Sequence, residues 1–318
     1  MKILFLGTPG FCLSFLNKIR EGETDEVTAI LTRPPKPAGR SYKIKESTLV
    51  LWARKNGIAV YTPEKVDQEF ESQIRALSVD LGVVVAYGKI LPLSFIQIFP
   101  RGCINIHFSL LPRYRGPAPI QRALMNGDKK TGVSVIFLSE KLDEGDVIVQ
   151  KEVDIQEEDT AGTLQERLIE VGTELLGEAI ELIRRGNPPR RRQDFTHASF
   201  APAIKKSDAW IDWSLPARQI FNQVRAFYPW PGSVTTFRGK RLKILQARVY
   251  NSLNGDIRSE SPSGEIVKPV KEKGFVVACG EGHLLVLGVQ QENRSRVSAF
   301  SFWQGGRLKP GERLGKEE

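Results

Sequence analysis

The sequence contains little cysteine and little histidine. Of its 318 residues, three are cysteine (Cys12, Cys103 and Cys279) and three are histidine. No two cysteines form a CxxC pair, which argues against a disulfide framework and against a cysteine-rich zinc site. Because the histidines are scattered and the cysteines isolated, no metal-ligand set stands out, and no metal is expected. No serine or cysteine has the surroundings of a catalytic nucleophile.

Long apolar runs are also absent. The longest, residues 81–86, is far shorter than the ~20 residues that a membrane-spanning helix needs. The opening MKILFLGTPG lacks a long apolar segment and an A-x-A cleavage site, so we interpret it as a strand and not as a signal peptide. The sequence therefore predicts a soluble, cytoplasmic protein without a membrane partner. Because no apolar surface stripe stands out, we expect a monomer.

The charge is unevenly distributed along the chain. Lys and Arg total 46 and Asp and Glu 37, giving a net charge of +9. Residues 1–187 contain 24 basic and 25 acidic residues, whereas residues 188–318 contain 22 and 12, so the second part has a net charge of +10. Within the first part, residues 33–55 alone have a net charge of +6. This distribution indicates a polyanionic partner, particularly for the second part.

The hydrophobic pattern predicts two domains. Strand-like and helical segments alternate over residues 1–187, which predicts a Rossmann-like, open and mostly parallel α/β sheet. Its long helix, after residue 163, is expected to begin with a capping box formed by Thr163 and Glu166. A Pro- and Arg-rich linker occupies residues 188–206. Residues 207–318 combine one helix with five short strands, which predicts a small OB-like β-barrel. The segments that carry these predictions are strands at 2–6, 28–31, 81–86, 104–108, 133–138, 233–237, 242–249, 264–267, 275–279 and 284–289, and a helix at 216–227.

Three segments offer polar groups at the ends of predicted strands. Gly7-Thr8-Pro9-Gly10 is either a phosphate-binding turn or a tight strand-to-helix turn, and it does not match GxGxxG. In NIHFSLLP, alternation places Asn105, His107 and Ser109 on one face of a strand. Ligand sites of open α/β sheets lie at such strand ends. Asn can donate a hydrogen bond to a developing oxyanion, and His can donate or exchange a proton. The alternative is that both side chains are satisfied structurally at the strand edge.

The third segment is acidic. Leu142-Asp143-Glu144-Gly145-Asp146 follows the strand at 133–138 and is expected at the same edge of the sheet. A carboxylate there can orient His107 and stabilise its cationic form. The spacing leaves open which of the three carboxylates does so, and an acidic turn without catalytic role is the alternative. Asn, His and Asp without a nucleophile suggest direct transfer to the nucleophile of the substrate itself.

These motifs resemble the folate-dependent formyltransferase superfamily. The stretch SLLPRYRGPAPIQRAL, residues 109–124, resembles its signature, and Asn105, His107 and Asp143 match its catalytic residues. Within the superfamily the chain most resembles the methionyl-tRNA formyltransferases, through ILFLGTPGF at the start, the KPAGR loop, VVAYGKILP at 84–92 and FYPWPG at 227–232. It departs from the family at Phe108, a position that is often small, and in the shortened LDEGD segment.

The resemblance implies transfer of the formyl group of 10-formyltetrahydrofolate to the α-amino group of methionyl initiator tRNA. Arg40 is the residue expected to determine specificity for the tRNA, so Arg40→Ala should weaken tRNA use and leave folate binding intact. The implied folate-binding residues are Ala86, Tyr87, Gly88, Ile90, Leu91, Ser109, Leu110, Leu111, Pro112, Leu142 and Glu144. The expected tRNA-binding residues are Lys36, Arg40, Lys43, Lys45, Arg238, Lys240, Arg241, Lys243 and Arg248.

Other interpretations remain at this point. The loop at 33–45 and the basic strand residues can equally be solvated surface. We expect Trp210, Trp213, Phe227 and Trp230 to pack in the core and between domains rather than to stack on bases. A formyltransferase acting on a small amine explains Asn105, His107 and Asp143 equally well but not the basic second part. An RNA-binding protein with an inactive α/β domain explains the charge but makes that triplet coincidental.

Overall fold

A computed structural model describes residues 1–22, 24–35, 37–38, 43–44, 46–251, 261–306 and 308–315. The predicted tRNA contacts of Lys36, Arg40 and Lys45 lie outside the described residues, and only the backbone of Lys43 is described. The chain divides into two compact units, each built from three separate segments. The first contains Met1–Pro119, Lys130–Asp154 and Glu166–Pro202; the second contains Ile120–Lys129, Ile155–Gln165 and Ala203–Glu318.

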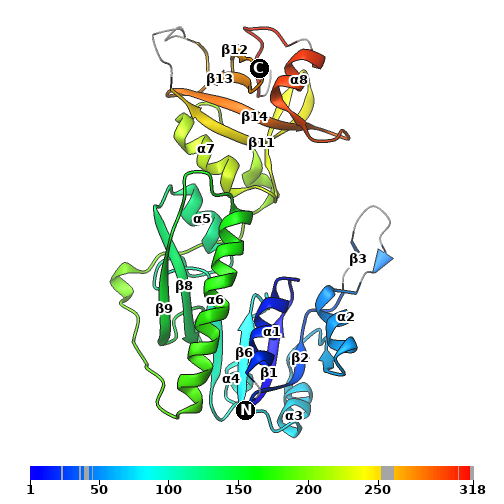
Figure 1. The fold of residues 1–318 in the computed structure, drawn as a ribbon, viewed down its shortest axis with the longest axis vertical. Helices are drawn as coiled ribbons and strands as arrows, with labels where there is room; N and C mark the ends of the chain where they lie inside the picture. The colour runs from blue at the N-terminus through cyan, green and yellow to red at the C-terminus, as the bar shows by residue number, and fades with distance from the viewer. Residues whose placement is uncertain are drawn as a thin grey trace. The chain divides into compact units, whose positions relative to one another are not determined.

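The first unit is built on a mixed sheet (Figure 1) with the strand order β5-β2-β1-β6-β7-β8-β9. The pairs from β5 to β7 are parallel, and β8 pairs antiparallel with both β7 and β9. The predicted open, mostly parallel α/β sheet is therefore confirmed. The strands are β1 (Lys2–Gly7), β2 (Glu26–Leu31), β5 (Ala59–Tyr61), β6 (Leu81–Val85), β7 (Cys103–His107), β8 (Lys130–Phe137) and β9 (Val147–Asp154).

Helices cover both faces of this sheet because its central strands are apolar on both sides. Every residue of β6 is buried, as expected for a parallel strand between two layers. On one face, Leu4 and Leu6 pack with Phe70 and Phe95, whose rings stack 6.2 Å apart. On the other, Gly172 allows close approach to Phe15. The helices are α1 (Cys12–Glu21), α2 (Thr48–Lys55), α3 (Gln68–Ala76), α4 (Leu93–Ile96) and α6 (Ala161–Arg184), with a short hairpin of β3 (Pro37–Ala38) and β4 (Lys43–Ile44).

Several elements of this unit were not predicted. Strand β5 is short and only partly buried, so it carries no clear alternation. Helix α3 begins after Asp67, whose carboxylate accepts a hydrogen bond from the Phe70 amide at 3.0 Å. The predicted capping box of α6 is wrong: the helix begins at Ala161, and the Thr160 hydroxyl accepts from the Thr163 amide. Strand β9 was missed because its second half alternates exposed and partly buried residues at an edge.

The second unit is a small antiparallel β domain, as predicted, with strand order β10-β11-β14-β13-β12 and β15 beside β14. Its core joins the sheet to helix α7 through Ile220 and Val224, which pack with Leu242, Ile244 and Val286. Helix α8 was not predicted. The elements are α5 (Pro119–Met125, from Ile120 onward in this unit), α7 (Ala217–Ala226), β10 (Ser233–Phe237), β11 (Lys240–Tyr250), β12 (Ile266–Val270), β13 (Gly274–Ala278), β14 (His283–Gln291), β15 (Val297–Ser298) and α8 (Ala299–Gly306).

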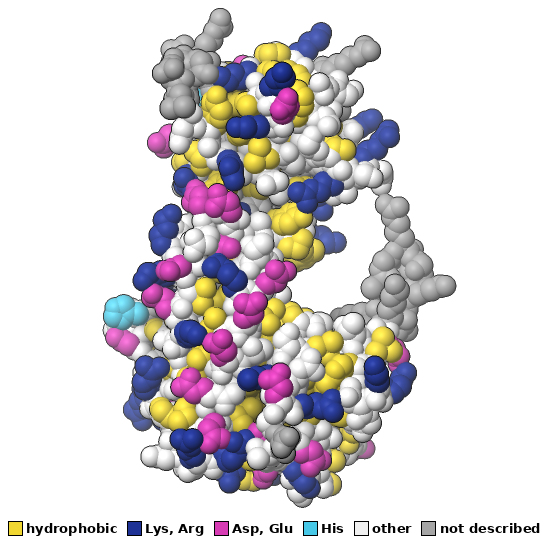
Figure 2. Space-filling model, in the orientation of Figure 1, with side chains coloured by type: hydrophobic (Ala, Val, Ile, Leu, Met, Phe, Trp, Pro, Cys, Tyr) yellow, Lys and Arg dark blue, Asp and Glu magenta, His cyan; other side chains and the backbone are white. Residues whose placement is uncertain are grey.

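The two units differ in surface charge. Acidic and basic side chains are interspersed over the first unit on the face drawn in Figure 2, whereas basic side chains predominate over the second. In the part of the chain that the structure describes, no helix combines the length and apolarity needed to cross a membrane.

Candidate active site

The carboxyl ends of β6 and β7 lie side by side. The two strands are parallel, and Val84 pairs with Asn105. Residues 86–91, which follow β6, and residues 108–113, which follow β7, therefore leave the sheet at the same edge. These are the two main segments implied to bind folate, and strand ends of this kind are where open α/β sheets bind ligands.

His107, the last residue of β7, is held between two oxygen atoms. Its side chain is 7% exposed, with Nε2 2.9 Å from the carbonyl oxygen of Tyr114 and Nδ1 3.6 Å from Oδ2 of Asp143. A carbonyl oxygen can only accept, so Nε2 carries a hydrogen and donates it. In the neutral ring Nδ1 is then the unprotonated nitrogen. If Nδ1 takes up a proton, the resulting positive charge lies beside the Asp143 carboxylate.

Asp143 reaches His107 by a route that the sequence did not predict. Strand β8 is antiparallel to β7, with Phe137 opposite Ile104 and Ser134 opposite His107. The carboxyl end of β8 therefore lies beside the start of β7, and not at the edge expected from parallel strands. The connection between β8 and β9 returns Asp143 to the histidine. Asp143 has a φ of +54°, and its Oδ2 accepts from the Gly116 amide at 2.8 Å.

A buried arginine holds the Asp143 loop. Arg115 is 2% exposed, its Nη1 donates to Glu144 at 2.9 Å, and its Nε and Nη2 donate to Oε1 of Gln193 at 3.2 and 2.8 Å. The Gln193 amide in turn donates to the carbonyl oxygens of Asp143 and Gly145. Arg115 and Gln193 are thus bonded to each other, and each also bonds to the acidic loop. Arg115 and Gln193 were missed because arginine is mostly exposed and glutamine carried no motif.

Asn105 offers an unoccupied hydrogen-bond donor next to this histidine. It lies two residues before His107 on the same strand, so both side chains are on the same face. Asn105 is partly exposed, and within the described residues its side-chain amide has no hydrogen-bond partner. Ile106, between them, points to the opposite face, toward Gly172 of α6. The amide is thus available to a bound substrate.

The loop after His107 is fixed by its own hydrogen bonds. The fully buried Ser109 donates from Oγ to the Arg113 carbonyl at 2.6 Å, so its hydroxyl serves the loop. Ser134 donates to the Ser109 carbonyl, and the Gln150 amide donates to the Leu111 carbonyl. Leu111 is buried, while Leu110 and Pro112 are partly exposed. Backbone restraint of this kind keeps the strand end in one shape.

Phe108 packs into the core between the strand and α1. Its ring lies 5.9 Å from that of Phe11 and 6.4 Å from that of Phe15. The side chain is 9% exposed, so the large residue at this usually small position is accommodated by aromatic packing. The departure from the family pattern thus leaves the adjacent polar side chains in place.

The segment after β6 combines buried anchors with exposed positions. Tyr87 is 1% exposed, and its carbonyl accepts a hydrogen bond from Thr8 Oγ1 at 3.0 Å. The glycine-rich opening turn therefore helps to hold this segment. Ala86 and Gly88 have φ angles of +48° and +77°. Exposure over the implied folate residues ranges from buried Leu91 to largely exposed Leu142 and Ile90.

Cysteine does not supply a nucleophile here. Burial raises the pKa of Cys12 and of Cys279 to about 12, and it also raises the pKa of Cys103. All three therefore remain thiols at neutral pH. In the described residues no group of three His, Cys, Asp or Glu side chains is arranged to hold a metal ion.

The basic residues predicted to bind tRNA whose side chains are described fall into two classes, those that form an ion pair with a described carboxylate and those that do not. Arg238 pairs with Glu312 at 2.7 Å and Arg248 with Glu158 at 3.4 Å. Lys240 and Arg241 are exposed and have no carboxylate partner among the described residues, and Lys243 donates to the Pro231 carbonyl at 3.1 Å.

Of the four aromatic residues predicted to pack internally, two are buried and two are exposed. Trp213 and Phe227 are buried, as expected, with exposed fractions of 5% and 0%. For Trp210 and Trp230 the prediction is wrong, since they are 43% and 55% exposed. Local sequence did not distinguish the two pairs because all four lie near turns or helix ends.

Comparison with known proteins gives two successive family matches along the chain. Residues 1–180 match the formyl transferase family, and residues 203–307 match the formyl transferase C-terminal domain. The methionyl-tRNA formyltransferase of Carboxydothermus hydrogenoformans is 42% identical over 312 residues, covering 98% of this chain and 99% of that protein. That of Fusobacterium nucleatum is 40% identical over 315 residues, covering 99% and 100%.

A solved structure shares the fold at lower identity. The N-formyltransferase of Helicobacter canadensis, in complex with folinic acid and dTDP-3-aminofucose, superposes with a TM-score of 0.65. It is 20% identical, and the match covers 92% of this chain and 99% of that one. At this identity the likeness concerns the fold alone.

Proposed function

The chain belongs to the methionyl-tRNA formyltransferase family, and we propose that Asn105, His107 and Asp143 carry out its reaction. The enzyme transfers the formyl group of 10-formyltetrahydrofolate to the α-amino group of methionyl-tRNA. The observation that carries the assignment is the arrangement of His107. Its Nε2 is occupied by a carbonyl, its Nδ1 faces Asp143, and an unengaged Asn105 lies beside it.

The amine of methionine attacks the formyl carbon directly, and the formyl oxygen becomes an oxyanion. Asn105 donates a hydrogen bond to that oxyanion, and a single donor of this kind typically contributes about 2.7–4 kcal/mol to the transition state. Its amide is suited to this role because it makes no competing bond within the described residues. His107 has its Nε2–H directed at Tyr114, so oxyanion stabilisation falls mainly to Asn105.

His107 and Asp143 transfer the proton that the attacking amine loses. The attacking nitrogen must lose a proton, and the unprotonated Nδ1 of His107 accepts it. Asp143, 3.6 Å away, stabilises the imidazolium that forms. The same proton then passes to N10 as the bond between the formyl carbon and N10 breaks, which releases tetrahydrofolate and leaves the formyl group on the amine.

Folate binding is assigned to the strand ends around these residues. The backbone of residues 86–91 and of the 109–112 loop offers hydrogen-bonding groups to the amide-like pterin ring, and Leu142 adds an exposed apolar surface. Glu144 acts through the loop, since its carboxylate is paired with Arg115. We further propose a monomer in the cytoplasm, with Arg40 reading the tRNA.

The decisive experiment supplies 10-formyltetrahydrofolate and compares three acceptors. These are methionyl-tRNA, free methionine and a small amine such as an amino sugar nucleotide. We expect formylation of methionyl-tRNA alone. Transfer to the small amine alone would reject the tRNA substrate. No transfer to any acceptor would favour an RNA-binding protein without catalytic activity. Asn105→Ala serves as the matched inactive control, because the substitution removes only a partly exposed amide.

A further inference from the structure

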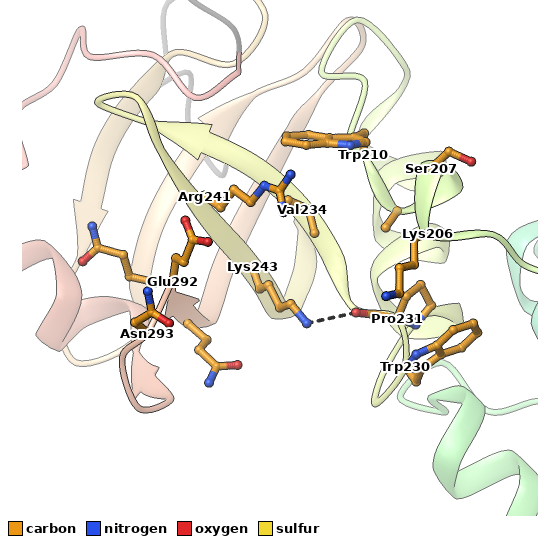
Figure 3. A pocket seen from close by; sticks show the side chains of 13 residues that line it. Lys206, Ser207, Trp210, Trp230, Pro231, Val234, Arg241, Lys243, Glu292 and Asn293 are labelled. Atoms are coloured by element: carbon orange, nitrogen blue, oxygen red, sulfur yellow. Dashed lines mark hydrogen bonds between the residues drawn. The ribbon is translucent and has the colours of Figure 1, made fainter. Parts of the chain in front are cut away.

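A cavity in the second unit combines exposed tryptophans with cations that form no ion pair among the described residues. Its volume is about 620 Å³, within the range of ligand sites. We call it the Trp210–Trp230 pocket, and Figure 3 shows Arg241 and Lys243 between the two indoles on one side and Glu292 on the other.

The backbone of Trp210 is held in place, and the rings of both tryptophans are accessible. The backbone of Trp210 is fixed because its carbonyl accepts from Gln223 and the next amide donates to Val234. The indole is nevertheless 43% exposed, and that of Trp230 is 55% exposed. An indole is a rigid stacking surface with few rotatable bonds, so its ordering on binding has a low entropic cost.

The cations of the pocket have unused donors. Arg241 and Lys206 are exposed and form no ion pair among the described residues, and Lys243 uses one donor on the Pro231 carbonyl. Elsewhere in this unit Arg218, Arg238 and Arg248 each pair with a glutamate. Cations without an ion pair among the described residues therefore lie beside the exposed indoles, although others, such as Lys271 and Lys273, lie elsewhere on this unit.

Strand β11 explains this placement. Arg241 and Lys243 alternate with Leu242 and Ile244, which lie in the core, so both cations face outward on the same side. Beyond Ile244 the register between β11 and β14 is irregular, so the alternation of buried and exposed side chains changes there. The Arg241 guanidinium also lies 5.7 Å from the Trp210 ring centre, so a phosphate-binding group and a stacking surface adjoin.

We propose that this pocket binds one unpaired nucleotide of an RNA, an inference that rests on the tRNA substrate of the proposed function. The base stacks on Trp210 or Trp230, and its phosphate binds Arg241 and Lys243. Glu292, on the opposite side, accepts a hydrogen bond from an exocyclic amino group of the base. Only an unpaired base presents its face to an indole, whereas a duplex presents phosphates. An acidic peptide has the charge but not the flat ring.

The test measures binding of a labelled octacytidylate to the full-length protein by fluorescence anisotropy, at several salt concentrations and without formyl donor. Trp210→Leu and Trp230→Leu should weaken binding about fivefold to a hundredfold with an unchanged salt slope. Trp→Phe at either position should restore part of the loss. Arg241→Met should weaken binding and also lower the salt slope by about 0.7.

Lys273→Met is the matched control, since Lys273 is exposed in the same unit, does not line the pocket and is not among the residues expected to bind tRNA. It should retain the affinity of the wild type more closely than Arg241→Met. Wild-type affinity in both tryptophan variants, or equal binding of a duplex of the same length, would overturn the proposal. Thermal unfolding of each variant verifies folding. Formylation of methionyl-tRNA by the wild type separately tests the proposed function.

Discussion

Arg115 and Arg241 have the same side chain in opposite surroundings. Arg115 is 2% exposed, and its guanidinium is shared between Glu144 and Gln193. Arg241 is exposed and has no carboxylate partner among the described residues. The first belongs to a network that ends at a proposed catalytic aspartate, and the second lies in a pocket with two accessible indoles.

The difference separates two uses of positive charge. A buried charge must be compensated inside the protein, so its partners are fixed and it holds backbone in place. An exposed, unpaired cation contributes little to the fold and remains available to a polyanion. Arg241 is therefore available to the proposed RNA ligand, whereas Arg115 positions a loop.

The largest expected effect concerns Asn105, the proposed oxyanion donor, and His107, the proposed proton acceptor. Asn105→Ala and His107→Ala should each lower kcat for methionyl-tRNA about a hundredfold or more, because each removes a group that acts on the reacting atoms. Steady-state formylation at saturating folate measures this. Octacytidylate affinity should not change in either variant, and near-wild-type kcat in one variant would reject the role given to that residue.

The comparison between the two arginines can be tested directly on stability. Arg115→Met should lower the free energy of unfolding by about 3 kcal/mol, because the partly buried Glu144 and the buried Gln193 lose their partner. Arg241→Met should change it by less than about 0.5 kcal/mol. Urea unfolding of both variants provides the measurement. Equal losses would show that the two surroundings do not differ as described.

A smaller contrast compares two glycines. A β-carbon on Gly145, in the loop held by Gln193, would lie 1.6 Å from the Phe137 carbonyl oxygen, so the loop must move. Gly145→Ala should therefore lower the free energy of unfolding by about 2 kcal/mol and lower kcat as well. Gly305 in α8 has no atom within 4 Å of such a carbon, and Gly305→Ala should stabilise the protein by about 0.5 kcal/mol. Losses of similar size in the two variants would contradict a specific constraint at residue 145.

Short-range pattern predicted much of the fold and part of the site. The β10 strand was predicted with its observed bounds, and alternation placed Asn105 and His107 on one face of β7. The direction of β8 and the N-cap of α6 were predicted wrongly, and helix α8 was not predicted. Strand direction depends on which neighbour a strand pairs with, and hydrophobic periodicity does not contain that information.

The sequence by itself determined the strand-and-helix pattern, the face that carries Asn105 and His107, and the concentration of positive charge in the second part. Only the tertiary structure decided that Asp143 reaches His107 from an antiparallel connection, that Arg115 is buried and that Trp210 and Trp230 are exposed. The reason is the separation along the chain of the residues that interact. Periodicity arises from neighbouring residues, whereas burial of Arg115 depends on Gln193, which lies 78 positions away in the chain.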